Sequence, residues 1–138
     1  MIKSFEIIYI FYFSILYSNI ILVPEDYSSI QLAINNANNT DTVLVDSGVY
    51  VENITIDNLS ISLLSSYGPS NTIIDGNYNG SVINVNSQED SVLIRGFTIK
   101  NGIGELLDAG SRFGGGIISH NTALILDSLI IENNESFA

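Results

Sequence analysis

Two segments of this sequence repeat each other residue by residue, and this repeat restricts the possible folds more than any other feature. The segment VLIRGFTIKNG, Val92 to Gly102, aligns with LILDSLIIENN, Leu124 to Asn134, at an offset of 124 − 92 = 32 residues. The motif NTIIDGN aligns with the second half of the same pattern, because Ile74 falls on Ile99 at an offset of 25. Units of about 20 to 50 residues that recur along a chain are typical of solenoids, in which each unit stacks on its neighbour.

The repeat units consist of short apolar runs rich in β-branched residues and separated by Asn, Gly, Asp and Ser. None is long enough for a helix. The runs from residue 42 onward are TVLV, NITI, LSISLL, NTII, SVINV, SVLI, FTI, GGII, ALIL and SLII. Because such strands stack on copies of themselves one coil away, the repeat predicts parallel pairing and an all-β, single-stranded parallel β-helix. The insertion from Ile103 to Phe113 explains why the offset between the later repeats, 32 residues, is longer than the earlier offset of 25 residues.

Alternation along these strands predicts which side chains point inward. We expect Ile94, Phe97 and Ile99 to lie inside the stack, on Leu126, Leu129 and Ile131 of the next coil. Each buried aliphatic side chain contributes about 1.5 to 3 kcal/mol, whereas ordering the backbone costs about 1 to 2 kcal/mol per residue. One coil alone is therefore near zero in stability, and the fold depends on stacking.

A short helix is predicted before the repeats. Ser28 is placed to accept a hydrogen bond from the Gln31 amide at a helix start. Apolar residues then follow at helical spacing: Ile30, Ala33, Ile34 and Ala37. We interpret residues 19–41 as a first strand, IILV, followed by a capping helix that covers one end of the stack. Residues 42–138 are interpreted as β-helix coils that are truncated at the C-terminus, with the rest of the β-helix missing.

The N-terminus has the pattern of an export signal. Lys3 precedes a charge-free run from Ile7 to Ser18, which has the length of a signal-peptide core and is short for a membrane span. We interpret residues 1–18 as a signal peptide and expect a secreted or cell-surface protein, extracellular or on the outer membrane, with no membrane insertion after cleavage. The alternative is an uncleaved anchor, because the apolar run continues to Val23.

Composition excludes several classes of partner and site. The 138 residues carry 4 basic and 15 acidic side chains, for a formal net charge of −11. This balance is wrong for neutralising phosphates, so nucleic acid and anionic membrane surfaces are not expected partners. Cysteine is absent, which excludes disulfides, thiol catalysis and Cys-ligated metal sites.

From Ile20 onward the chain resembles the right-handed parallel β-helix proteins of the pectin-lyase-like superfamily. The segments that carry the resemblance are VPEDYSSIQLAINNANNTDTVLVDSGVYVENITI, NTIIDGN, VLIRGFTIKNG, GGGI and LIIENN. The resemblance implies a right-handed helical stack. It does not imply one activity, because that superfamily includes lyases, esterases, hydrolases, epimerases, adhesins and proteins without known chemistry.

Three functions are compatible with the resemblance. The first is a secreted or surface-displayed module that binds polysaccharide or is structural, with no catalytic site in this segment. The second is the N-terminal part of a polysaccharide lyase, hydrolase or esterase. The third is an adhesin of the polymorphic outer-membrane type, whose repeats resemble GGGI followed by an I-x-x-N strand. Whether the protein is an enzyme is left open.

The segment Gly48 to Glu52 matches the GxYxE segment of pectin methylesterases, but the remaining esterase motifs are absent from the sequence. We therefore give these residues structural roles. Gly48 is expected in a turn, Tyr50 in packing, and Glu52 in hydrogen bonds to nearby backbone amides.

Several acidic residues along the chain are candidate ligands for a Ca²⁺ cofactor. Two of them could also form a catalytic acid/base pair. They are Asp46, Asp57, Asp75, Asp90 and Asp127. No two form a D-x-D or D-D motif, so turn roles are favoured. The lyase chemistry of the superfamily also needs a basic residue, but Arg95 and Lys100 align with Asp127 and Glu132 in the next coil. This alignment predicts charge pairs on the outer face of the stack.

The insertion supplies the candidate binding residues. It carries Asp108, Arg112 and Phe113 and is followed by the single histidine, His120. Loops that project from a rigid scaffold are common binding sites, and an aromatic ring with an arginine suits a sugar. We therefore predict polysaccharide contact through these four residues, the alternative being that His120 is a solvated turn residue.

The signal-peptide interpretation predicts a new N-terminus between Ser18 and Ile21 in exported protein. Mass spectrometry of secreted material measures this directly. Recovery of intact Met1 in a membrane fraction would instead identify the segment as an anchor.

Overall fold

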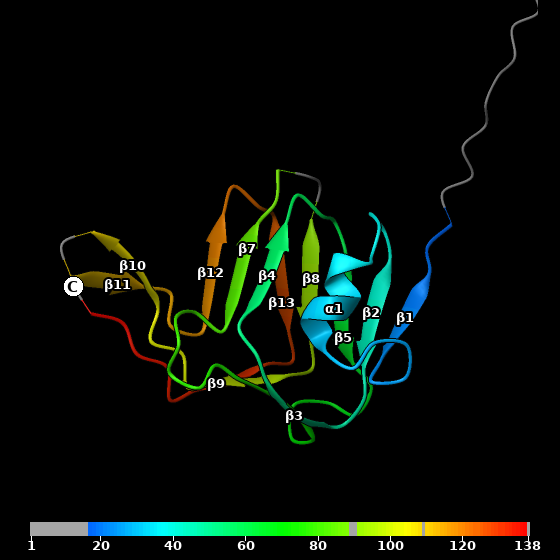
Figure 1. Ribbon diagram of the computed structural model, residues 1–138, viewed down its shortest axis with the longest axis horizontal. Helices are drawn as coiled ribbons and strands as arrows, with labels where there is room; N and C mark the ends of the chain where they lie inside the picture. Colours follow the sequence, from blue (N-terminus) through cyan, green and yellow to red (C-terminus); the bar gives the residue numbers. More distant parts are fainter. Residues whose placement is uncertain (1–16, 89–90, 109, 138) are drawn as a thin grey trace, which may run out of the picture.

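The computed structural model describes residues 17–88, 91–108 and 110–137, with the side chains of residues 107 and 108 left aside (Figure 1). The described chain is mostly β. Its elements are β1 (Ile20–Val23), α1 (Ile30–Asn35), β2 (Thr42–Val45), β3 (Gly48–Val51), β4 (Ile54–Asp57), β5 (Ser62–Ser65), β6 (Thr72–Asp75), β7 (Ile83–Asn86), β8 (Val92–Arg95), β9 (Thr98–Lys100), β10 (Glu105–Asp108), β11 (Ser111–Phe113), β12 (Ile117–His120), β13 (Leu124–Asp127) and β14 (Ile130–Glu132).

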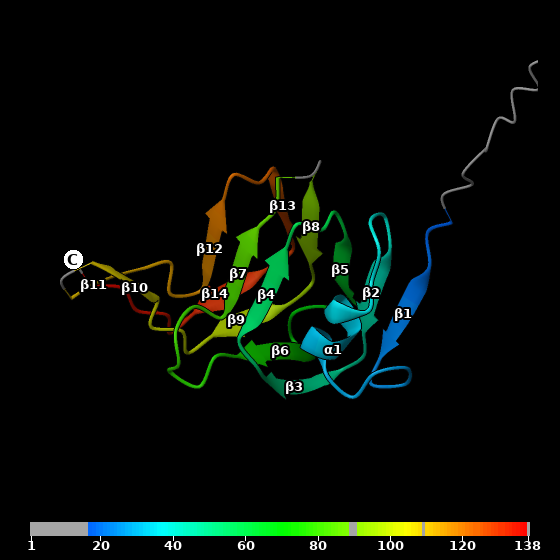
Figure 2. The ribbon, with the colours of Figure 1, turned by 45° about the horizontal axis from the view of Figure 1, so that its top comes forward.

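The strands form three parallel sheets. Sheet A has the order β1-β2-β5-β8-β13, sheet B the order β3-β6-β9-β14, and sheet C the order β4-β7-β12. From β2 onward the chain enters sheets A, B and C in turn, so each pass adds one strand to each sheet (Figures 1 and 2). Between β9 and β12 this order is interrupted by the antiparallel hairpin β10–β11.

The pairing register confirms the sequence repeat. Leu124 lies opposite Val92 in sheet A, at the predicted offset of 32. Ile74 lies opposite Ile99 in sheet B, at the predicted offset of 25. The hairpin lies within the predicted insertion, so the extra residues leave the stack and the strands after it return to register.

The core lies between the three sheets and contains the residues predicted to point inward. Ile94, Phe97 and Ile99 are each 0% exposed. Leu126 and Ile131 lie opposite Ile94 and Ile99 in the last described strands but are 45% and 52% exposed, because no further strand covers them in the described part of the chain.

Helix α1 begins one residue later than predicted. Its N-cap is Ser29, whose Oγ accepts from the Leu32 amide at 3.2 Å, so the prediction of Ser28 was wrong. The predicted apolar stripe is confirmed, since Ile30, Ala33 and Ile34 are buried. In Figure 2 the helix lies beside β2 and β4, at the end of the stack formed by β1.

Two side chains bind the helix to the strands. The Glu52 carboxylate accepts from the Ile30 and Gln31 amides at 3.0 and 2.9 Å, which confirms its predicted role as an acceptor for backbone amides. The Gln31 side chain accepts from the Thr55 amide at 2.7 Å and donates to the Thr55 carbonyl at 3.0 Å. Since β4 is the outer strand of sheet C, this pair satisfies backbone groups that would otherwise form an open sheet edge.

The GxYxE segment differs from its predicted conformation in one respect. Gly48–Val51 forms strand β3 rather than a turn, paired with β6. Tyr50 is partly buried against the core, as predicted, and its hydroxyl donates to the Asp46 carbonyl at 3.1 Å.

Some interpretations concern parts of the chain outside the described residues. The signal peptide at 1–18 lies almost entirely there, as does Asp90 among the candidate acids. In residues 17–137, apart from the gaps, no helix has the length and apolar character needed to span a bilayer.

The inward and outward positions of β9 give a test of the register. Replacement Ile99→Asp places a carboxylate inside the stack and should lower the free energy of unfolding by about 3 kcal/mol or more. Lys100→Asp changes an outward side chain and should cost about 1 kcal/mol. Thermal and denaturant unfolding of both variants measures the difference, and equal losses would mean that the register is wrong by one residue.

Candidate functional site

The four predicted binding residues do not form one cluster. Arg112 and Phe113 lie on β11, and the Arg112 guanidinium donates to the Gly104 carbonyl at 3.0 Å. Phe113 is 46% exposed. His120 is the last residue of β12, whereas the hairpin joins the first residue of that strand. Asp108 ends β10, and its side chain is outside the described part.

His120 instead belongs to a row of polar residues on the outer face of sheet C. Asp57, Asn86 and His120 lie opposite one another on β4, β7 and β12. A second row contains Thr55, Asn84 and Ile118. These residues lie on the outer side of the sheet, because the positions between them on β4 and β7 are buried in the core. Ile118 is nevertheless buried there and Asn84 is partly buried, so the second row is accessible chiefly at Thr55. Neighbouring strands are about 4.8 Å apart, so each row repeats at that interval along the stack.

The hairpin borders one end of these rows. The Asn84 amide nitrogen donates to the Glu105 carboxylate on β10, and Glu105 lies opposite Phe113 across the hairpin. Side chains directly opposite each other in an antiparallel pair are on the same face, so an exposed phenyl ring lies beside this carboxylate. The Asn84 Oδ1 atom is buried and has no hydrogen-bond partner among the described residues.

Helix α1 borders the other end. A pocket of about 300 Å³ lies between α1 and β4. It is lined by Gln31, Ile34, Asn35, Ala37, Thr55, Asp57 and Leu59. We use the name sheet C face for the surface formed by Thr55, Asp57, Asn84, Asn86 and His120, which extends from this pocket to the hairpin. In Figure 1 it is the front of β4, β7 and β12, between α1 and β10–β11.

The charged groups of the sheet C face are acidic. Asp57 is part of the face and Glu105 borders it, while the described basic side chains have contacts elsewhere. Arg95 pairs with Asp127 at 2.6 Å on the outside of sheet A, as the repeat predicts. Hydrogen bonds from Ser128 and then from Arg95 hold the pKa of Asp127 below its usual value.

Lys100 has a different partner from the one predicted. Its register partner in the next coil is Glu132, but its ammonium lies 3.7 Å from a carboxylate oxygen of Asp75 in the preceding coil. The prediction of a Lys100–Glu132 pair was therefore wrong. The lysine thereby joins a carboxylate that also accepts hydrogen bonds from neighbouring donors.

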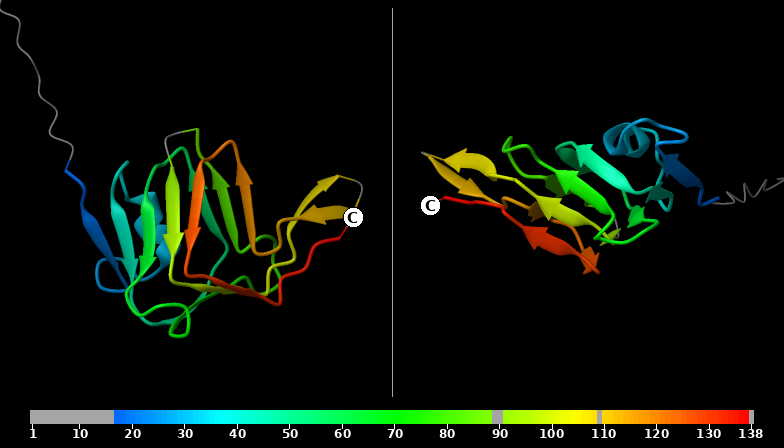
Figure 3. Two further views of the ribbon diagram at one scale, coloured as in Figure 1. Left: turned by 180° about the vertical axis from the view of Figure 1, so that it is seen from behind. Right: turned by 90° about the horizontal axis from the view of Figure 1, so that it is seen from below.

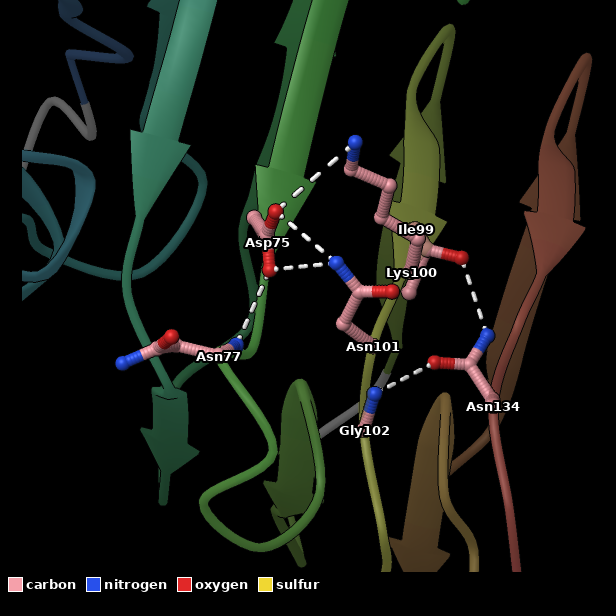
Figure 4. A network of polar contacts seen from close by, with 7 residues as sticks. All are labelled: Asp75, Asn77, Ile99, Lys100, Asn101, Gly102 and Asn134. Atoms are coloured by element: carbon pink, nitrogen blue, oxygen red, sulfur yellow. Dashed lines mark hydrogen bonds and ion pairs between the residues drawn. The ribbon is translucent and has the colours of Figure 1, made fainter.

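Figure 4 shows the polar network around Asp75. Its carboxylate accepts from the Asn77 amide at 2.9 Å and from the Asn101 side chain at 2.9 and 3.0 Å. In the next coil the Asn134 side chain accepts from the Gly102 amide at 2.8 Å and donates to the Ile99 carbonyl at 2.9 Å. These groups bond one another and the backbone of adjacent coils, so we assign the network to stacking rather than to ligand binding.

Asparagine tolerates the left-handed conformation and can stack amide on amide between repeats, so the sequence predicts turn roles for the asparagines between the apolar runs. They are Asn77, Asn79, Asn84, Asn86, Asn101, Asn121, Asn133 and Asn134. The left-handed conformation is confirmed at four of these positions. Asn77, Asn101, Asn121 and Asn133 all have φ between 47° and 60°. The side-chain nitrogen of Asn101 does not meet another amide in this way, because it donates to the Asp75 carboxylate.

The described residues do not form a set of ligands for Ca²⁺. Within the described ranges, no three His, Asp or Glu side chains lie close enough together to hold an ion. Asp46 accepts from the Ser47 amide next to it, and Asp57 is exposed on the sheet C face.

The sheet C face offers a chemistry of hydrogen bonds to an extended ligand. A carboxylate, an amide and an imidazole follow one another on the three strands, with one exposed aromatic ring at the border. Sequence reasoning found Phe113 and His120 but missed Asn84 and Asn86, which it assigned to turns. The alternation within SVINV, with buried Ile83 and Val85 on either side of Asn84, was the signal that could have placed them on the outer face.

No family model matches this chain, and the comparisons found neither a curated protein nor a solved structure similar to it.

The Asp75 network predicts a pH dependence of stability. Burial raises the pKa of Asp75, but hydrogen bonds from Asn77 and Asn101 and the charge of Lys100 outweigh it and lower the pKa overall. A carboxyl group whose pKa is lower in the folded state stabilises the fold above its unfolded pKa of about 3.9 and loses this contribution as the pH falls through the folded value. Asp75→Asn should therefore melt at a lower temperature than the parent protein at neutral pH, and this difference should shrink as the pH falls below about 4.

Thermal melts of both proteins between neutral pH and acid conditions measure the effect. A difference in melting temperature that is the same at every pH would contradict an ionised, hydrogen-bonded Asp75.

Proposed function

We propose that this protein is a secreted or cell-surface right-handed parallel β-helix with a capping helix, and that it binds a polysaccharide along its sheet C face. The cyclic order of sheets A, B and C, with parallel pairing in register, supports the β-helix. Connections between parallel strands are right-handed in nearly all proteins, which supports the handedness.

Helix α1 suits the role of a cap. It contributes Ile30, Ala33 and Ile34 to the core beside the first strands of the stack. Strand β1 is also protected at its outer edge, because the Asp26 carboxylate accepts from the Leu22 amide at 2.7 Å and the Asp26 and Tyr27 amides donate to the Leu22 carbonyl. Such contacts prevent further strand pairing at this end.

The observation that carries the binding proposal is the register of Asp57, Asn86 and His120 across three parallel strands. Sugar hydroxyls both donate and accept hydrogen bonds, and these three side chain types offer both kinds of partner. A polymer lying along the stack would meet one polar member of this row at each strand. Phe113, exposed at the border, provides an apolar surface for a sugar ring.

Binding is tested by electrophoresis in gels that contain a neutral or an acidic polysaccharide, followed by titration calorimetry with oligosaccharides of the retarding polymer. The variant Asn86→Ala/His120→Ala removes two neighbouring groups of the row. If each hydrogen bond contributes about 1 kcal/mol, the affinity should fall by roughly tenfold or more. Phe113→Ala should weaken binding further.

The matched control is Asn79→Ala, an exposed asparagine in the loop between β6 and β7, away from the row. This variant should bind as the parent protein does. Failure of the parent protein to bind any polysaccharide tested, or equal affinity of the double variant and the control, would contradict the proposal.

A further inference from the structure

The chain contains two Asn-Gly pairs, and the structure treats them differently. Asn79-Gly80 lies in the loop between β6 and β7, whereas Asn101-Gly102 directly follows β9. Strands β6 and β9 lie side by side in sheet B, which the right panel of Figure 3 shows from below. An asparagine that precedes glycine can react with its own backbone, because glycine has no Cβ to shield the amide nitrogen that attacks the side chain.

Both reacting groups of Asn101-Gly102 are held in place. The Asn101 side-chain nitrogen donates to the two carboxylate oxygens of Asp75 at 2.9 and 3.0 Å. The Gly102 amide, which would be the attacking group, donates to the Asn134 side chain at 2.8 Å (Figure 4). Gly102 is buried, and a Cβ at this position would collide with the Gly115 carbonyl. The surrounding backbone therefore leaves this pair no room to rearrange.

Asn79-Gly80 has none of these restraints. Asn79 is exposed, and its side-chain nitrogen makes one described contact, a long one of 3.5 Å to the Asn53 side-chain oxygen. The Gly80 amide donates to no acceptor in the described part of the chain. A Cβ at Gly80 would have nothing within 4 Å. Both the attacking amide and the group it attacks are thus free to approach each other.

We propose that Asn79 is a site of spontaneous deamidation in the folded protein and that the fold protects Asn101 from the same reaction. The Gly80 backbone nitrogen forms a bond to the Asn79 side-chain carbonyl carbon, and the bond from that carbon to the amide nitrogen breaks. Ammonia leaves with the proton of the Gly80 amide, and a succinimide ring remains. Water then opens the ring at one of its two carbonyls, which gives aspartate or isoaspartate at residue 79. The proposal is independent of the polysaccharide site.

The modification changes the charge of the loop and, as isoaspartate, the length of its backbone. One negative charge is added to the formal net charge of −11. Isoaspartate continues the chain through its side chain, which adds one backbone atom between Gly76 and Ser81. The carbonyls of these two residues accept from the Asn53 side chain at 3.4 and 2.9 Å. The added atom therefore changes the spacing of two groups that one asparagine holds together.

Peptide mapping by mass spectrometry tests the proposal. The full chain is incubated in a mildly alkaline buffer, in which the backbone amide loses its proton more readily, and peptides that contain Asn79 or Asn101 are followed over time. Reaction at Asn101 first requires the loss of its hydrogen bonds, so we expect residue 79 to deamidate faster by roughly tenfold or more. Equal rates at the two residues, or a faster reaction at Asn101, would overturn the proposal.

A parallel incubation in denaturant shows whether the fold causes the difference. Both Asn-Gly pairs lose their contacts in the unfolded chain, so residues 79 and 101 should then react at similar rates. A difference between the two residues that is as large in denaturant as in the folded protein would contradict protection of Asn101 by its contacts with Asp75 and Asn134.

Two variants identify the residue by charge. Isoelectric focusing of the incubated parent protein should show a growing, more acidic species. Asn79→Ser should remove this species. The matched control is Asn58→Ser, which changes an exposed asparagine that precedes leucine in the loop between β4 and β5, and it should leave the species unchanged. An acidic species that forms equally fast in Asn79→Ser would assign the reaction to another residue and overturn the proposal.

Discussion

The structure depends on pairing in register between strands of only three or four residues. A strand of this length has no stability of its own, and each gains both its hydrogen bonds and its apolar contacts from the neighbouring strands of its sheet. Ile74 and Ile99 illustrate this dependence, because each is fully buried only between neighbours in the same row. A slip of one residue would expose the whole row, so the turns must hold each strand to its place. The Asp75 network and the Asn134 contacts do so with side chains that bond from one coil to the next.

Much of the architecture could be predicted from the sequence because the repeat and the alternation are local patterns. Both offsets, the first strand IILV and the inward residues of β8 and β9 are confirmed by the register and the burial. The predictions that were wrong concerned a choice between two nearby residues of similar chemistry. Ser28 and Ser29 are both good N-cap residues, and in the structure Ser29 takes this position while Glu52 binds the amides of Ile30 and Gln31. Lys100 has an acid on either side, and its partner is the one that other donors hold in place.

The candidate site was harder to predict than the fold. Asparagine serves both turns and outward strand positions, so its type alone does not separate Asn77, which has a left-handed conformation, from Asn86, which lies in β7. His120 was found because it is the single histidine, but its neighbours in the row come from residues 34 and 63 positions earlier, and only the pairing of strands joins them. Phe113 was found as part of an insertion, and its position beside Glu105 follows from a hairpin register that the repeat does not contain.

The contact between Glu52 and helix α1 also has a consequence for the order in which the chain acquires structure. A helix of six residues does not persist in water, and this one receives two of its first amide bonds from a carboxylate 21 to 22 residues further on. A third contact of the helix, between the Gln31 side chain and the Thr55 amide, requires a residue still further along the chain. The helix therefore cannot be an early nucleus around which the strands assemble. During synthesis it must stay unformed until the residues of β3 and β4 have emerged, so the helix forms only after the chain has supplied the groups that bind it.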